Sequence, residues 1–140
     1  MTINLDTRLA ADTHILGTFD DCLLLLSKNA HFPWFILMPE TQEVEFHKLS
    51  TQQQTSTQQN INAIAEFIEG YFFTEKINIA SIGNIVSQMH IHVIGRHQND
   101  ACWPNVVWGT THFKAYETNE LNAIKIQLNK KLKTAFRTSS

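Results

Sequence analysis

An alternation of polar and apolar residues over positions 88–94 constrains the fold of this chain more than any other stretch. A period of two is typical of a half-buried β-strand, whose successive side chains point to opposite faces. The side chains of Gln88, His90 and His92 therefore share one face, and the apolar residues between them point into a core. Because a buried imidazole needs polar partners, two in register indicate a reactive centre, a metal site or a coincidence of surface histidines.

Short apolar or alternating segments predict an antiparallel sheet of about five strands. The Gly83-Asn84 turn joins the last two of these segments as a hairpin, and the second and third are close enough to pair in the same way. The first segment fits a connector as well as a strand. The five segments are residues 14–21, 22–26, 34–38, 76–82 and 86–95.

Three helices are expected around these strands. A short one is predicted at residues 5–10, and a long one begins after Ser50, with Gln53 as the return partner of a capping box and Gly70 as the stop signal. The last helix is expected over residues 120–136. Because strands and helices are grouped rather than strictly alternating, the pattern favours the α+β class.

Composition indicates an ordinary globular chain, with one domain expected over residues 1–140. The formal charge of −2 offers no basic footprint for duplex nucleic acid, and no apolar run is long enough to span a membrane. The N-terminus lacks the pattern of a secretory signal. Cys22 and Cys102 are expected to be reduced thiols of a cytoplasmic protein, although a disulfide between them is the alternative.

The histidine pair suits nucleophilic chemistry at phosphorus. A neutral imidazole is a nucleophile near pH 7, and a nucleotidyl-imidazole intermediate splits one displacement into two easier ones. The adjacent Gly83-Asn84 turn supplies backbone N–H groups and an amide for phosphoryl oxygens.

A metal site is the alternative for the same pair. His97, Asp100 and Cys102 are further ligand types that follow His90 and His92 along the chain, but no paired cysteine spacing supports zinc. We therefore expect neither a metal nor a cofactor.

Residues 78–96, NIASIGNIVSQMHIHVIGR, resemble the signature of the histidine triad (HIT) family of nucleotide hydrolases and transferases, in which three histidines alternate with apolar residues after a Gly-Gln or Gly-Asn turn. Residues 100–109, DACWPNVVWG, resemble a bacterial branch of that family. The resemblance implies a sheet of about five strands, a homodimer with a continuous sheet, and a nucleotide as the substrate. It also implies that His90 is the nucleophile, and that His92 and Asn84 contact the phosphate.

The chain departs from the family pattern at several positions. Gln88 stands where the family has its first triad histidine, and it cannot titrate near neutrality. The segment Phe32-Pro33-Trp34 replaces a Pro-Gly-His-like turn, and Glu40 stands where a basic residue is common. Ser27 and Asn29 lie nearest to the family's ribose- or base-binding asparagine.

Two residue types beyond the triad are further candidates for substrate binding. Arg96 either contacts phosphate or forms a surface salt bridge. Trp103 and Trp108 are candidates for the wall of a nucleobase pocket or for a dimer seam, with simple core packing as the alternative.

Together these features predict a hydrolase or nucleotidyl transferase that acts at the α-phosphate of a dinucleoside polyphosphate or a nucleoside phosphoramidate. His90 and His92 are the expected catalytic residues, with Gln88 positioning the site. The alternative is a nucleotide-binding or partner-binding module with weak chemistry, for which Gln88 is the sign.

Overall fold

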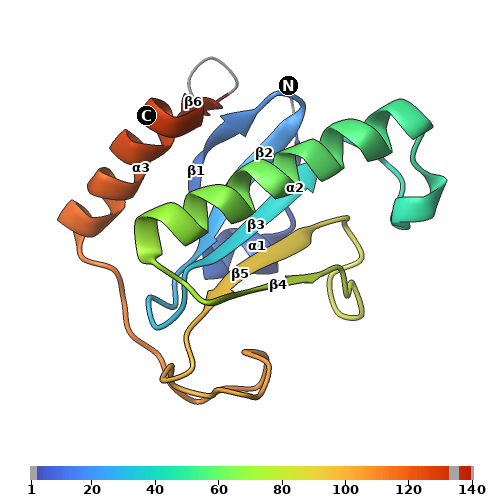
Figure 1. Cartoon of the computed structure of the whole chain (residues 1–140). Helices are drawn as coiled ribbons and strands as arrows, with labels where there is room; N and C mark the ends of the chain where they lie inside the picture. The colour runs from blue at the N-terminus through green and yellow to red at the C-terminus, as the bar shows by residue number, and fades with distance from the viewer. Residues whose placement is uncertain (1–2, 133–135, 140) are drawn as a thin grey trace.

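A computed structural model describes residues 3–132 and 136–139 and contains a six-stranded antiparallel sheet of order β4-β5-β3-β2-β1-β6 (Figure 1). The strands are β1 (Thr13–Phe19), β2 (Cys22–Ser27), β3 (Trp34–Pro39), β4 (Lys76–Ala80), β5 (Ile91–Arg96) and β6 (Phe136–Thr138). The helices are α1 (Thr7–Asp12), the 3-10 helix η1 (Phe46–Lys48), α2 (Thr51–Phe72) and α3 (Thr118–Leu132). This arrangement confirms a single α+β domain.

The sixth strand is an addition to the predicted sheet. Phe136 was expected to end the last helix, but it belongs to β6, which pairs with β1. Residues 133–135, also expected in that helix, lie outside the described residues. The pairing depends on Gly17, because a Cβ there would clash with the backbone oxygen of Arg137. Three residues are too few for a period of two to be recognised.

Helices cover both faces of the sheet. The helix α2 crosses one face, where Ile64 and Ile68 pack with side chains of the central strands (Figure 1). The short α1 lies on the opposite face, where Leu9 packs with Ile36 and Met38. Since β2 and β3 are covered on both sides, their sequences are continuous apolar runs, and they pair as the predicted hairpin.

The helix α2 begins as predicted and ends later. The Oγ of Ser50 accepts a hydrogen bond from the backbone N–H of Gln53 at 3.1 Å. The Gln53 side chain instead donates to the carbonyl of Glu40, so the reciprocal half of the capping box is absent. Gly70 does not stop the helix, which continues to Phe72 and ends at Phe73 in a left-handed conformation with φ of 56°.

The segment before β5 differs from the predicted strand. Residues 86–90 were expected to continue it, but β5 begins only at Ile91, and residues 81–90 form a loop from β4. Ala80, the last residue of β4, pairs with His92, so Gln88 and His90 have no partner on that strand. The expected two-residue hairpin turn at Gly83-Asn84 is therefore a longer connection, in which Gly83 has a φ of 68°.

No helix of the described residues is both long enough and apolar enough to cross a membrane.

Candidate functional site

The two histidines lie next to each other at the start of β5. Their ring centroids are 5.0 Å apart, and both residues are buried, with 7% of His90 and 6% of His92 exposed. His92 comes from the strand and His90 from the last residue of the preceding loop. The two side chains thus lie on the same face, as the alternating pattern predicts, although only His92 is in a strand.

The proton on His90 is fixed by its neighbour in the backbone. Its Nδ1 lies 2.6 Å from the carbonyl oxygen of Gln88. Because a carbonyl oxygen only accepts hydrogen bonds, Nδ1 carries the proton of the neutral ring. The Nε2 atom of His90 is therefore left with a free lone pair.

The proton on His92 is fixed in the opposite sense. The indole Nε1–H of Trp34 donates to Nδ1 of His92 at 2.9 Å. An indole nitrogen only donates, so Nδ1 of His92 is the acceptor and the proton of the neutral ring lies on Nε2. Burial, reinforced by the neighbouring His90, lowers the pKa of His92 to about 4. His92 is therefore a neutral donor near pH 7.

The burial of His92 predicts an acid-sensitive fold. Between pH 6.5, its ordinary pKa, and about pH 4, its pKa in the folded chain, the unfolded state takes up a proton that the folded state refuses. The free energy of unfolding should therefore fall as the pH drops through this window, by up to about 3 kcal/mol from this group. Urea unfolding at pH 7.5 and 4.5 measures this loss of free energy. The difference between the two pH values should be smaller in His92→Gln than in the wild type. Equal pH dependence in both chains would contradict the assignment.

Tryptophan rings surround His92. The Trp108 ring lies 5.0 Å from the imidazole of His92 and 5.7 Å from the indole of Trp34, edge to face in both cases. Trp103, named from the sequence as a binding residue, instead lies against the guanidinium of Arg96 at 5.6 Å. Trp34 was noted only as a departure from a family pattern, and its contact with His92 depends on strand register.

Arg96 is buried and occupied by protein partners. Its Nε and one terminal nitrogen donate to the carboxylate of Asp100 at 2.7 and 3.0 Å, and the other terminal nitrogen donates to Asn78 at 3.0 Å. Its guanidinium also lies 5.6 Å from the Phe32 ring, and only 1% of the residue is exposed. Arg96 therefore anchors the loop after β5 rather than facing solvent, where a phosphate would reach it.

Asn29 and Ser27 hold two loops together. The Asn29 side chain donates to the carbonyl of His112 at 2.9 Å and accepts from the backbone N–H groups of His31 and Lys114. The Oγ of Ser27 accepts from the backbone N–H of Asn29. Only 8% of Asn29 is exposed, so its amide is used to fix residues 112–114 beside the β2–β3 turn.

A small hollow of about 100 Å³ opens beside His90. Ser81, Gly83 and Ser87 of the loop line it together with Gln88 and His90, whereas Asn84 is exposed and does not. The side chain of Gln88 points its amide at the N-terminal segment. Its Oε1 accepts from the N–H of Asp6 at 2.9 Å, and its Nε2 donates to the carbonyl of Asn4 at 2.8 Å.

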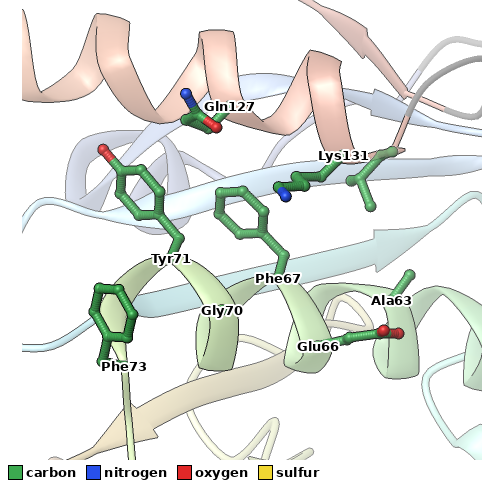
Figure 2. A pocket seen from close by; sticks show the side chains of 9 residues that line it. Ala63, Glu66, Phe67, Gly70, Tyr71, Phe73, Gln127 and Lys131 are labelled. Carbon is green, nitrogen blue, oxygen red and sulfur yellow. The ribbon is translucent and has the colours of Figure 1, made fainter.

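A wider groove of about 730 Å³ lies between α2 and α3 (Figure 2). Phe67 and Tyr71 of α2 form its floor with stacked rings, and Gln127 and Lys131 of α3 lie opposite. It is the larger of the two and is lined by Glu66 and Lys131 as well as aromatic rings, but no histidine lines it. The chemistry therefore places the candidate site at the smaller hollow.

The described residues contain no cluster of ligands that would support the metal alternative. Within residues 3–132 and 136–139, no three His, Cys, Asp or Glu side chains gather closely enough to hold a metal ion. Of the candidates, Asp100 binds Arg96, and Nδ1 of His97 lies 3.7 Å from the carboxylate of Glu75.

The chain is thus an antiparallel α+β domain with two adjacent, buried histidines of opposite tautomer at the start of β5. The HIT domain matches residues 8–99, and the chain belongs to this family. A histidine triad protein from Marinobacter aquaeolei VT8 is 35% identical over 94% of this chain and 97% of its own, with a TM-score of 0.87. One from Sinorhizobium meliloti 1021 is 32% identical over 93% and 97%, with a TM-score of 0.88.

A more distant match shows the fold alone. The diadenosine triphosphate hydrolase of Plasmodium falciparum, solved in complex with Cyclomarin A, is 20% identical, with a TM-score of 0.62 over 93% of this chain and 82% of its own. A search of curated proteins gave no match.

Proposed function

We propose that this protein is a hydrolase or nucleotidyl transferase that acts at the α-phosphate of a nucleoside phosphate derivative through a nucleotidyl-His90 intermediate. The observation that carries the proposal is the pair of fixed tautomers, with a lone pair on Nε2 of His90 and a hydrogen on Nε2 of His92. One ring is thereby prepared to attack phosphorus and the other to donate to a phosphoryl oxygen. The fold shared with a diadenosine triphosphate hydrolase supports a dinucleoside polyphosphate as substrate, and a phosphoramidate offers the same α-phosphate.

The reaction proceeds in two displacements. In the first, Nε2 of His90 attacks the α-phosphorus, a P–N bond forms, and the bond to the leaving nucleotide or amine breaks. The leaving group takes the electron pair, and an amine also takes a proton from solvent. In the second, water attacks the same phosphorus, the bond to His90 breaks, and the proton lost by water passes to solvent.

The remaining residues hold and orient the reacting groups. Gln88 takes the place of the first triad histidine and acts through its backbone carbonyl, which keeps the proton of His90 on Nδ1. Its side chain fastens residues 4–6 beside the site. The backbone at Gly83 lines the hollow, and Asn84 next to it is available for the outer phosphate.

The intermediate is the direct test. The protein is mixed with diadenosine polyphosphates or adenosine phosphoramidate, quenched in alkali because imidazole–phosphorus bonds are acid-labile, and digested for mass spectrometry. We expect one nucleotidyl adduct, mapped to His90, together with release of a nucleoside monophosphate. Turnover with an adduct at another residue would overturn the assignment, and no turnover on any such substrate would overturn the function.

A binding module with weak chemistry is the second candidate. One observation favours it: the amide of Gln88 is bound to the backbone of the N-terminal segment and so is not free to contact a substrate. Calorimetry with adenosine and guanosine monophosphates, run beside the turnover assay, separates the two candidates. Binding without turnover supports the module.

The active unit is proposed to be a homodimer paired along β4. This strand is an edge of the sheet and has a free row of backbone groups. Exposed isoleucines lie on it and on the loop that follows, namely Ile79 at 53%, Ile82 at 45% and Ile85 at 79%. The hollow at His90 is below the range of about 300–1,000 Å³ that encloses a whole ligand, so a second copy would supply cover for the nucleoside.

Sedimentation tests the dimer. Wild-type protein is expected to sediment as two chains, and Ile79→Lys as one, because a buried charge at the pairing edge is costly. The matched control is Ile126→Lys, since Ile126 on α3 is 54% exposed and far along the chain from β4. A monomeric wild type, or a dimer that survives Ile79→Lys, would refute this interface.

We also place the protein in the cytoplasm, because Cys22 and Cys102 are both free thiols. Burial raises the pKa of Cys22 to about 12, which makes that thiol unreactive.

A further inference from the structure

We infer that Trp34 is a positioning residue that locks His92 as a neutral hydrogen-bond donor, with its only ring proton on Nε2. The hydrogen bond and its effect on the imidazole follow from the geometry of the chain alone. Its meaning for catalysis rests on the proposed function, in which His92 contacts the phosphoryl oxygens.

Strand register brings the two side chains together. In the ladder between β3 and β5, Ile36 is opposite His92 and Trp34 is opposite Ile94. Trp34 and His92 are therefore diagonal neighbours on one face, a separation that large aromatic side chains can bridge. The indole is held in place by Trp108, whose ring meets it edge to face at 5.7 Å.

The indole permits one state of the imidazole. Its Nε1–H lies 2.9 Å from Nδ1 of His92, so a proton on Nδ1 would put two hydrogens against each other. This excludes both the neutral Nδ1–H tautomer and the doubly protonated imidazolium as long as the contact persists. Because tryptophan has no acceptor and does not titrate, the indole offers no acceptor to a proton on Nδ1 at any pH, so His92 can be protonated only where this contact is broken.

Few charged or titratable groups lie near His92 in the described part of the chain. Among the described residues, the titratable group that faces it is His90, at 5.0 Å, and the rings of Trp34 and Trp108 cover it from β3 and from the loop after β5. An imidazolium at this position would repel a positive charge on His90 and compete with the leaving group for protons. A locked neutral donor stabilises a phosphoryl oxygen without either effect.

Nuclear magnetic resonance tests the lock without any need for turnover. Long-range ¹H–¹⁵N spectra of histidine-labelled protein between pH 4.5 and 8 report the state of each ring nitrogen. In the wild type, we expect His92 to be neutral with Nδ1 unprotonated over most of this range, and to begin to take up a proton only at its acid end, because its pKa is about 4. In Trp34→Phe, loss of one hydrogen bond should raise its proton affinity about tenfold and move the titration midpoint up by about one pH unit.

Two controls keep the result interpretable. Trp108→Phe removes the other indole from the same imidazole without removing a hydrogen bond to it, and should leave the protonation state of Nδ1 as in the wild type. A coupling across the hydrogen bond between Trp34 Nε1 and His92 Nδ1 can be sought in the wild type, which covers the case in which Trp34→Phe does not fold. An Nδ1–H tautomer in the wild type, or the same titration in Trp34→Phe, would overturn the inference.

Kinetics connects the lock with catalysis. The acid limb of kcat/KM should gain one further ionisation in Trp34→Phe, because His92 then also takes a proton. If the NMR lock is found but no nucleotide is turned over, the proposed function fails and the tautomer assignment stands. If turnover is found but the acid limb is the same in both proteins, the positioning role fails alone.

Discussion

Replacing His90 with asparagine should lower kcat by at least about 10³-fold on any substrate that the wild type turns over. An amide is not a nucleophile towards phosphorus, so no nucleotidyl intermediate can form. Asparagine is smaller than histidine and its Nδ2 can still donate to the Gln88 carbonyl, which preserves the local contact. Steady-state kinetics, together with the adduct assay, measures the loss.

Binding should survive this substitution. Nucleoside monophosphate affinity, measured by calorimetry, is expected to stay within a few-fold of the wild type, because the hollow keeps its loop residues. His47→Asn is the matched control, since His47 is exposed on η1 and lies outside the proposed site. Turnover that persists in His90→Asn would remove the nucleophile from this residue, and a loss shared by His47→Asn would indicate a general effect on the fold.

The local part of the site could be predicted from the sequence because it depends on neighbours along the chain. The period of two places His90 and His92 on one side, and this holds even though the strand begins at Ile91. The hairpin of β2 and β3 follows from two apolar runs of matching length. Both features are decided within a few residues, where alternation and turn chemistry are informative.

The long-range part could not be predicted in the same way. The side chain of Gln88 binds the backbone at Asn4 and Asp6, more than 80 positions away. The contact between Trp34 and His92 requires the β3–β5 register, which only the folded sheet sets. The sequence shows that Asn29 is polar but not what it contacts, so it was a candidate for substrate binding. In the structure its side chain forms hydrogen bonds that hold two loops together.

Arg96 was a candidate for phosphate binding on the same grounds, and its surroundings lead to the second large prediction. Arg96→Leu should destabilise the fold by about 3–5 kcal/mol, because it leaves the carboxylate of Asp100 buried without its partner. The arginine keeps the pKa of that carboxyl below its usual value, so its charge persists at neutral pH. Urea unfolding at pH 7 measures the loss.

The double variant Arg96→Leu/Asp100→Leu distinguishes a structural role of Arg96 from a role in substrate binding. Removing both charges should recover much of the lost stability, because replacing a buried pair costs far less than breaking it. A phosphate ligand would behave differently: Arg96→Leu would then raise KM and leave the unfolding free energy nearly unchanged. We expect a loss of stability rather than a higher KM, because the guanidinium is almost fully buried between Phe32, Trp103 and Asp100. The loop after β5 should then lose its fixed position, and with it the contact between Trp108 and His92.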